Sequence, residues 1–107
     1  MEFNTYQEFA SSTALYTDPI VYPALGLAGE SGEVAEKVKK LLRGDKGREV
    51  TEEFKKSVAM ELGDVLWYVS QVAKDIDYKL EDIARLNIEK LSNRQKKGTL
   101  KGSGDNR

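Results

Sequence analysis

Residues 26–42 read GLAGESGEVAEKVKKLL, and residues 57–73 read SVAMELGDVLWYVSQVA. The two stretches carry identical residues at aligned positions: Ala28 and Ala59, Glu30 and Glu61, Gly32 and Gly63, Val34 and Val65, and Val38 and Val69. In both stretches apolar residues recur at intervals of three and four, as they do on one face of a helix. The sequence therefore predicts two amphipathic helices that repeat one pattern, with the rest of the fold arranged around them.

Acidic side chains lie at the edges of the apolar stripe on both expected helices. At about 100° per residue, Glu30 lies roughly 40° from Val34, and Glu61 has the same place on the second helix. Glu33 and Asp64 lie about 60° from these partners, on the far side. If the stripes pack together, four carboxylates converge, and burying one unpaired charge costs several kcal/mol. The pattern therefore predicts a divalent cation between the helices.

Composition bounds the fold and the kind of metal. The chain has 107 residues, 39% of them hydrophobic and 33% charged, with only two prolines. These values favour one all-α domain over a β-rich fold. The sequence contains no cysteine and no histidine, which excludes disulfides, thiol catalysis and zinc–thiolate sites. A bound metal would therefore take oxygen ligands, which points to Mg²⁺, with Mn²⁺ as a substitute.

Hydropathy and charge bear on location and partners. No apolar run reaches membrane-spanning length, and the N-terminus lacks a signal-peptide pattern, so we expect a cytoplasmic protein without membrane contact. Residues 1–89 hold 17 acids and 11 bases, whereas residues 90–107 hold six bases and a single acid, Asp105. This basic end could reach nucleic acid, fold back onto a phosphate held by the body, or simply keep the chain soluble.

Capping signals divide the chain into four expected helices. A capping box at Thr5 predicts a helix over residues 5–16, and a second helix follows from about residue 18 to Arg43. Thr51 is expected to cap a third helix ending near residue 76, and a fourth spans about residues 80–97. Short connections predict an antiparallel four-helix bundle over residues 1–97, followed by a flexible, glycine-rich basic tail at 98–107.

The last expected helix carries hydrogen-bond donors on its apolar side. Asn87 interrupts the apolar face, Arg94 follows on the same side, and Lys90 flanks them. Together they indicate a surface that meets anions. The alternative is that the two cations extend past the core or pair with the acids of the other helices. Likewise, Gly32 and Gly63 leave room either for a ligand or for close helix packing.

These motifs resemble a known family. GLAGESGEVAEKVKK followed by MELGDVLWYVSQVA is similar to the MazG-type all-α nucleotide pyrophosphohydrolases, whose pattern is EExxE, a spacer and then ExxD. Asn87, Lys90 and Arg94 resemble the family's series on the last helix, and the terminal GSGDNR resembles the ending of small members. One departure is that Gly29 stands where the leading glutamate of EExxE is expected.

The resemblance implies a fold, a reaction and an assembly. A (deoxy)nucleoside triphosphate would be hydrolysed to the monophosphate and pyrophosphate by water attack at the α-phosphate, with Mg²⁺ as cofactor. A dimer or dimer of dimers would share active sites between chains. The implied metal ligands are Glu30, Glu33, Glu61 and Asp64, with Glu33 or Glu61 also orienting the water. The implied substrate contacts are Asn87, Lys90, Arg94, Lys37 and, near the base, Tyr68.

Two other functions remain open from the sequence. One is a non-catalytic helical interaction module whose basic tail binds nucleic acid or a protein partner, although nucleic acid is not the partner we expect. The other is a related pyrophosphatase that acts on a phosphoribosyl-linked nucleotide. A panel of nucleotides with pyrophosphate detection, run with and without Mg²⁺, separates these functions from the first.

Overall fold

The computed structural model describes residues 1–45, 47–102 and 104–105, and over them its only regular elements are α-helices, without a β-strand. The helices are α1 (Phe3–Ser12), α2 (Val21–Arg43), α3 (Glu52–Asp75) and α4 (Leu80–Lys97). The prediction of an all-α chain is confirmed. Among these described residues, no helix is both long enough and apolar enough to cross a membrane.

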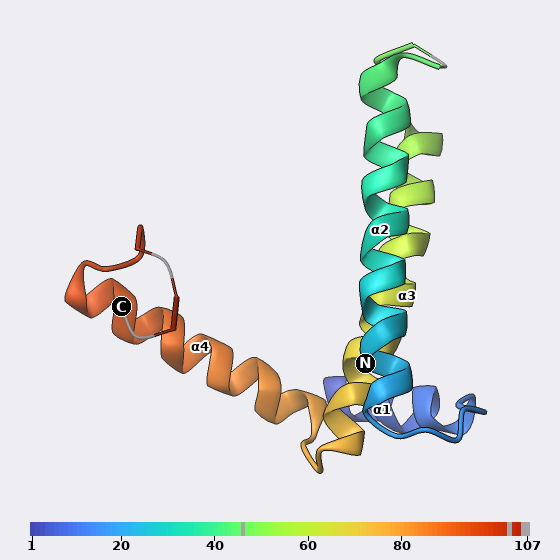
Figure 1. The fold of residues 1–107 in the computed structure, drawn as a ribbon. Coiled ribbons are helices and arrows are strands. Elements are labelled where there is room, and N and C mark those ends of the chain that lie inside the picture. The colour runs from blue at the N-terminus through green and yellow to red at the C-terminus, as the bar shows by residue number, and fades with distance from the viewer. Residues whose placement is uncertain (46, 103, 106–107) are drawn as a thin grey trace.

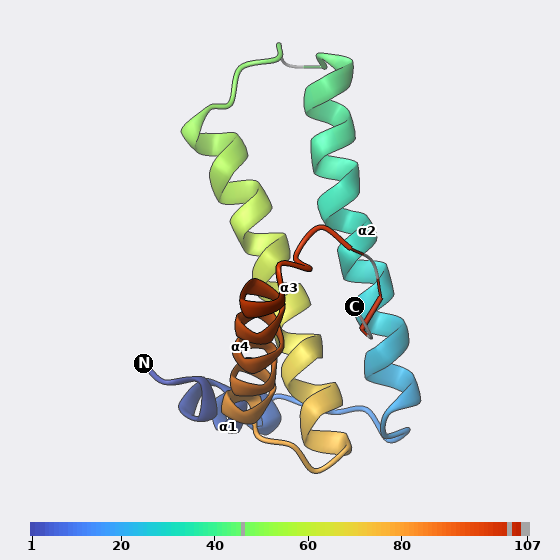
Figure 2. The same cartoon turned by 90° about the vertical axis from the view of Figure 1, so that its left-hand side faces the viewer.

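A long hairpin of α2 and α3 forms the body of the molecule (Figures 1 and 2). The helix ends at its tip follow the sequence signals. Gly44 is left-handed at φ 83°, and its N–H donates to the Leu41 and Lys40 carbonyls, which ends α2. Thr51 Oγ1 accepts the Phe54 N–H at 3.0 Å, which caps α3. Both expected boundaries are confirmed.

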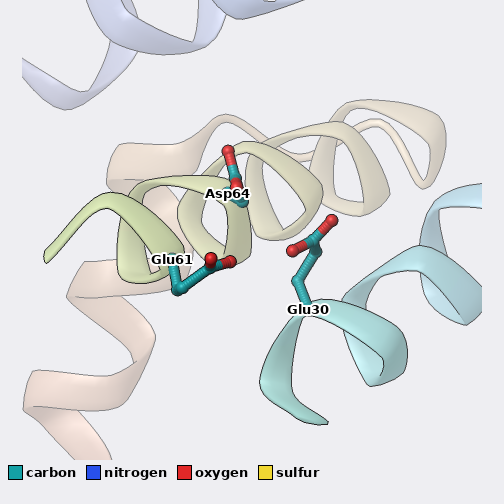
Figure 3. Close-up of side chains that lie close together, drawn as sticks. All are labelled: Glu30, Glu61 and Asp64. Atoms are coloured by element: carbon teal, nitrogen blue, oxygen red, sulfur yellow. The ribbon is translucent and has the colours of Figure 1, made fainter. Parts of the chain in front are cut away.

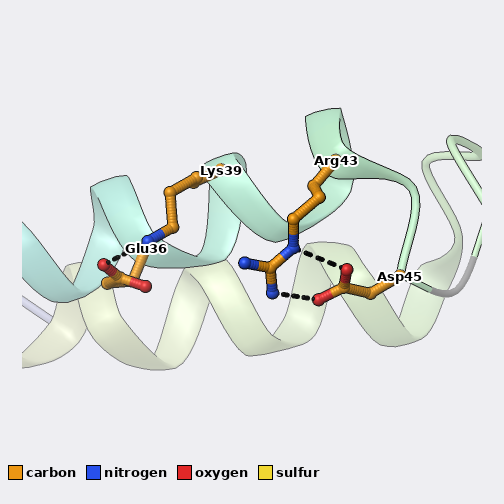
Figure 4. Close-up of polar contacts among 4 residues, drawn as sticks. All are labelled: Glu36, Lys39, Arg43 and Asp45. Atoms are coloured by element: carbon orange, nitrogen blue, oxygen red, sulfur yellow. Dashed lines mark hydrogen bonds and ion pairs between the residues drawn. The ribbon is translucent and has the colours of Figure 1, made fainter.

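Two ion pairs lie on the solvent-facing side of α2 and the residues that follow it, near that tip (Figure 4). Lys39 Nζ donates to Glu36 Oε1 at 2.9 Å, and the Arg43 guanidinium forms a two-pronged pair with the Asp45 carboxylate. The hydrogen bond from Lys39 holds the pKa of Glu36 below its ordinary value, and Arg43 does the same for the pKa of Asp45. Because these pairs face solvent, they add little to stability.

The first helix differs from its predicted boundaries. It starts at Phe3 and ends at Ser12, with Glu2 as its N-cap and no side-chain cap. The capping box predicted at Thr5 is therefore wrong, since Thr5 already lies inside the helix. The second helix begins at Val21, and Pro23 is tolerated because it falls in the first turn, where a backbone N–H has no helical partner.

The buried core is small and lies where α1 crosses the base of α3 and the start of α4. Ala10, Ala73 and Leu80 are its buried apolar residues, and Gln7 lies among them. The Gln7 amide donates to the Ser70 and Tyr78 carbonyls, at 3.0 and 3.1 Å. Its Oε1 accepts the Leu80 N–H at 2.9 Å. One side chain of α1 thereby fixes the turn from which α4 departs.

From that turn α4 projects away from the hairpin (Figure 1), so the helices do not form the closed bundle expected within one chain. The apolar stripe expected to be buried is covered only at its start: Leu80 is buried, Ile83 and Ala84 are half-buried, and Leu91 is exposed. Leu86 and Ile88, outside that stripe, are also exposed, Ile88 to 67%. The radius of gyration is 16.7 Å, against about 13 Å for a compact chain of this length. The accessible surface is 8074 Å², against about 6,000 Å² for a monomer of this mass. The sequence pattern gives α4 an apolar stripe but does not say whether its own chain or another chain covers that stripe.

Candidate metal centre

Three carboxylates meet across the middle of the α2–α3 hairpin. Glu30 comes from α2, and Glu61 and Asp64 come from successive turns of α3 (Figure 3). One oxygen from each lies within 4.8 Å of the others. The helical repeat produces this meeting, because each motif places its glutamate at the edge of the stripe along which the two helices pack.

The cluster is electrostatically unfavourable as it stands. The pKa of Glu30 is raised, first by partial burial and then by the negative charges of Asp64, Glu61 and Glu33. The pKa of Tyr6 on α1 is also raised, by burial and by the Asp64 carboxylate. Both shifts have the sign expected where negative charges lie close together.

The donor set fits a hard divalent cation. All three groups offer carboxylate oxygens, which suit Mg²⁺ and Mn²⁺, and the sequence has no cysteine or histidine that would favour a softer metal. Carboxylates from two different helices also allow a cation to hold the hairpin together. Glu30, Glu61 and Asp64 are therefore the residues that would bind such an ion.

Glu33 is placed differently from the other three predicted ligands. Its side chain is exposed, and it is not among the carboxylates that lie within 4.8 Å of one another. It lies one turn of α2 beyond Glu30, close enough to raise the pKa of Glu30. The structure thus brings three of the four predicted acids together and leaves Glu33 at the rim.

Tyr68, one helical turn from Asp64 on α3, packs against Gly26 of α2. A Cβ built on Gly26 would lie only 2.2 Å from Tyr68 Cε1. Gly26 is one turn before Glu30 on α2, and Tyr68 is one turn after Asp64 on the antiparallel α3, so the two lie at one level of the hairpin. Gly26 was not predicted as a site residue. Its spacing from Glu30 was the available signal, but using that spacing requires the helix register.

An aromatic group continues from Tyr68 towards the α1–α2 connection. Tyr16 stacks on Tyr22 with ring centroids 5.3 Å apart, and Trp67 meets both Tyr16 and Tyr68 edge-on. Trp67 Nε1 donates to Thr13 Oγ1 at 2.8 Å. These rings line a cavity of about 500 Å³, and the three carboxylates are not part of its lining. Burial, and then interactions with Tyr22, raise the pKa of Tyr68, with smaller effects from Glu30 and Asp64.

The predicted phosphate-binding residues lie elsewhere in the chain. Asn87, Lys90 and Arg94 are on α4, which points away from the hairpin that carries the carboxylates (Figures 1 and 2). Asn87 is exposed, Lys90 is half-buried and Arg94 is buried. Lys37 lies further along α2 and lines a separate cavity of about 520 Å³ near the hairpin tip. A single chain therefore does not bring these residues to the carboxylates.

Comparison with known proteins identifies the family. The model of the MazG nucleotide pyrophosphohydrolase domain matches residues 23–99, which include α3, α4 and nearly all of α2. This chain belongs to the MazG family. It is also 43% identical, over 115 aligned residues covering the whole of both chains, to the Gene 37 protein of Mycobacterium phage L5. No solved structure matches it significantly.

Gly29 stands where the MazG pattern EExxE has its leading glutamate, and the space around Gly29 shows whether packing requires a glycine there. A Cβ at Gly29 would meet nothing within 4 Å, so packing within the chain does not require glycine there. The same is true of Gly32 and Gly63, which the sequence left open between close packing and room for a ligand. Close packing within one chain is excluded for all three. These positions leave open surface beside the carboxylates of the MazG domain.

Proposed function

We propose that this MazG-family chain hydrolyses a (deoxy)nucleoside triphosphate to the monophosphate and pyrophosphate in the presence of Mg²⁺. The observation that carries the proposal is the meeting of Glu30, Glu61 and Asp64 oxygens, from two helices, within 4.8 Å of one another. Membership of the family supports the same reaction type.

The chain's own groups divide the chemistry between them. Glu30, Glu61 and Asp64 would hold Mg²⁺, which, when bound, neutralises charge that develops on the phosphate oxygens. Glu33 or Glu61 accepts the proton of the water that attacks the α-phosphorus. Glu33 is the better placed, because its carboxylate stands outside the cluster. The bond between the α-phosphorus and its bridging oxygen breaks, and pyrophosphate leaves with that oxygen.

A second copy of the chain supplies the remaining contacts in this proposal. Asn87, Lys90 and Arg94 project away from their own carboxylates, and α4 has exposed apolar residues, Leu86, Ile88 and Leu91, for another chain to cover. Bound in this way, the cations of one chain reach the triphosphate held at the carboxylates of the other. A homodimer, or a dimer of such dimers, satisfies both requirements.

The proposed reaction is tested by pyrophosphate release from a panel of canonical and modified nucleotides, with and without Mg²⁺. Release from at least one nucleotide, only with the metal, is expected. Glu61→Gln keeps the shape of the side chain but loses its charge, and should abolish turnover while circular dichroism shows an intact fold. Glu53→Gln, an exposed position on the same helix, is the matched control and should retain activity. Normal turnover in Glu61→Gln would refute the metal centre.

A further inference from the structure

Gly104 and Asp105 fold back onto α4 and contact two of the proposed phosphate-binding residues. Asp105 Oδ1 accepts a hydrogen bond from Lys90 Nζ at 2.9 Å and another from Arg94 Nη2 at 3.1 Å. Arg94 Nη2 also donates to the Gly104 carbonyl at 3.0 Å. Two cations on one face of a helix, four residues apart, thus converge on one carboxylate oxygen.

The two sides of this contact differ in how firmly they are held. The Arg94 side chain is 8% exposed, whereas that of Asp105 is 78% exposed. Lys90 and Arg94 stand on a continuous helix, and Asp105 sits beyond its end, past the left-handed Gly98. Arg94 is therefore the most firmly held partner, Lys90 is intermediate with 41% of its side chain exposed, and the carboxylate is the group that can leave.

Arg94 also retains donor capacity that Asp105 does not use. Its Nε is buried, and no hydrogen-bond acceptor meets it among the described residues. A guanidinium binds most strongly when adjacent N–H groups engage two oxygens of one anion. Of the three Arg94 nitrogens, only Nη2 contacts an oxygen of Asp105, whereas a phosphate group has several oxygens that could engage the others as well. The site is better matched to a phosphate than to the carboxylate that fills it.

We propose that Asp105 is a tethered substitute for a substrate phosphate: it occupies the anion site of Lys90 and Arg94 in the free protein and is displaced when the triphosphate binds. The proposal rests on the proposed function for the identity of the incoming anion. Asp105 thereby sets the apparent affinity for substrate, because every binding event must first break its two contacts. The Lys90 and Arg94 hydrogen bonds also keep the pKa of Asp105 low, so it remains charged and competes at neutral pH.

The alternative role for Asp105 is a brace that holds the two cations in their working positions. The two roles predict opposite effects of removing its charge. Under competition, Asp105→Asn frees the cations, and phosphate binds more tightly. Under bracing, the cations lose their orientation, and phosphate binds more weakly.

The experiment uses inorganic tripolyphosphate as the probe, titrated calorimetrically into the full chain without Mg²⁺. Asp105→Asn is expected to bind it about threefold more tightly, a change typical of an exposed ion pair. Asp82→Asn makes the same change of charge on an exposed residue of α4 and should leave the affinity unchanged. Combined with Lys90→Ala and Arg94→Ala, Asp105→Asn should have no effect, because the competition acts through those two cations.

Steady-state kinetics supply the second readout, with any nucleotide that is hydrolysed. A lower KM with kcat unchanged is expected for Asp105→Asn. Unchanged or weaker tripolyphosphate binding in this variant would overturn the proposal, as would an equal gain in Asp82→Asn. Because the titration involves no catalysis, an inactive protein that still shows the threefold gain would refute the proposed reaction and leave the competition standing.

Discussion

The ring of Tyr68 occupies the space that a side chain at position 26 would need. A Cβ on Gly26 would stand 2.2 Å from Tyr68 Cε1 and 2.4 Å from Cζ, far inside van der Waals contact. The contact lies one helical turn from Glu30 on α2 and from Asp64 on α3, and at that level the two helices are close together. The spacing of α2 and α3 beside the three carboxylates therefore depends on a glycine that is not one of the candidate ligands.

Gly26→Ala should consequently destabilise the chain, although alanine is the better helix former. We expect a loss of about 1–3 kcal/mol from the forced movement of the ring, against a gain of about 0.5–1 kcal/mol in helix propensity. Chemical denaturation measures the balance. Gly29→Ala, on the same helix with open space around it, should be neutral or stabilising. In a Tyr68→Ala background the penalty at position 26 should vanish, and a penalty that persists there would mean that the ring is not its cause.

The three carboxylates predict a specific response to metal. Mg²⁺ at about 100 times its dissociation constant should stabilise the chain by about 2.7 kcal/mol. Glu30→Gln should remove most of this gain without lowering the stability of the metal-free protein, because it also removes a repelling charge. Thermal unfolding with and without Mg²⁺ measures both. Glu36→Gln, at an exposed residue of the same helix, should keep the full response.

Sharing of sites between chains predicts complementation. Glu61→Gln removes a carboxylate, and the double variant Lys90→Ala/Arg94→Ala removes the cations, so each should be inactive alone. In a mixed dimer one site receives both defects and the other receives none. An equal, re-equilibrated mixture should therefore regain about a quarter of wild-type turnover. If each chain completed its own site, the mixture would stay inactive.

The connection between α1 and α2 predicts a pH effect. Tyr16 donates its hydroxyl hydrogen to Asp75 Oδ2 at 2.9 Å, and burial together with this contact raises the pKa of Tyr16 from 10.0 to about 12. Because the folded-state value is the higher one, the stabilisation is complete below the unfolded value and is lost as the pH rises through about 12. Tyr16→Phe should abolish this part of the alkaline destabilisation, and the variant's ultraviolet titration should lack the latest-ionising tyrosine.

The sequence contained most of what positions the candidate site along each helix. Gly44 and Thr51 marked the hairpin tip because a left-handed stop and a side-chain cap are local events. The period of the apolar residues put Glu30 and Glu61 at the packing edge. By contrast, Thr5 gave a false start: α1 already begins at Phe3, and Asn4, before Thr5, accepts the Glu81 N–H of α4 through its Oδ1.

What the sequence could not supply was the relation between elements. The contact of Gly26 with Tyr68 depends on the register of two helices, and the exclusion of Glu33 from the cluster depends on their rotation. The direction of α4 was the largest gap. Its apolar stripe, which ends at the exposed Leu91, predicts burial equally well against its own chain or another.

The hydrogen bonds that Gln7 makes to the turn before α4 affect a part of the molecule far from Gln7 itself. These hydrogen bonds set the direction of α4, whose cations, in the proposed assembly, contact the substrate bound by the neighbouring subunit. Damage to the first dozen residues of one subunit would then leave its own acids untouched and disable the site on its partner, so that each faulty copy costs a sound neighbour its activity.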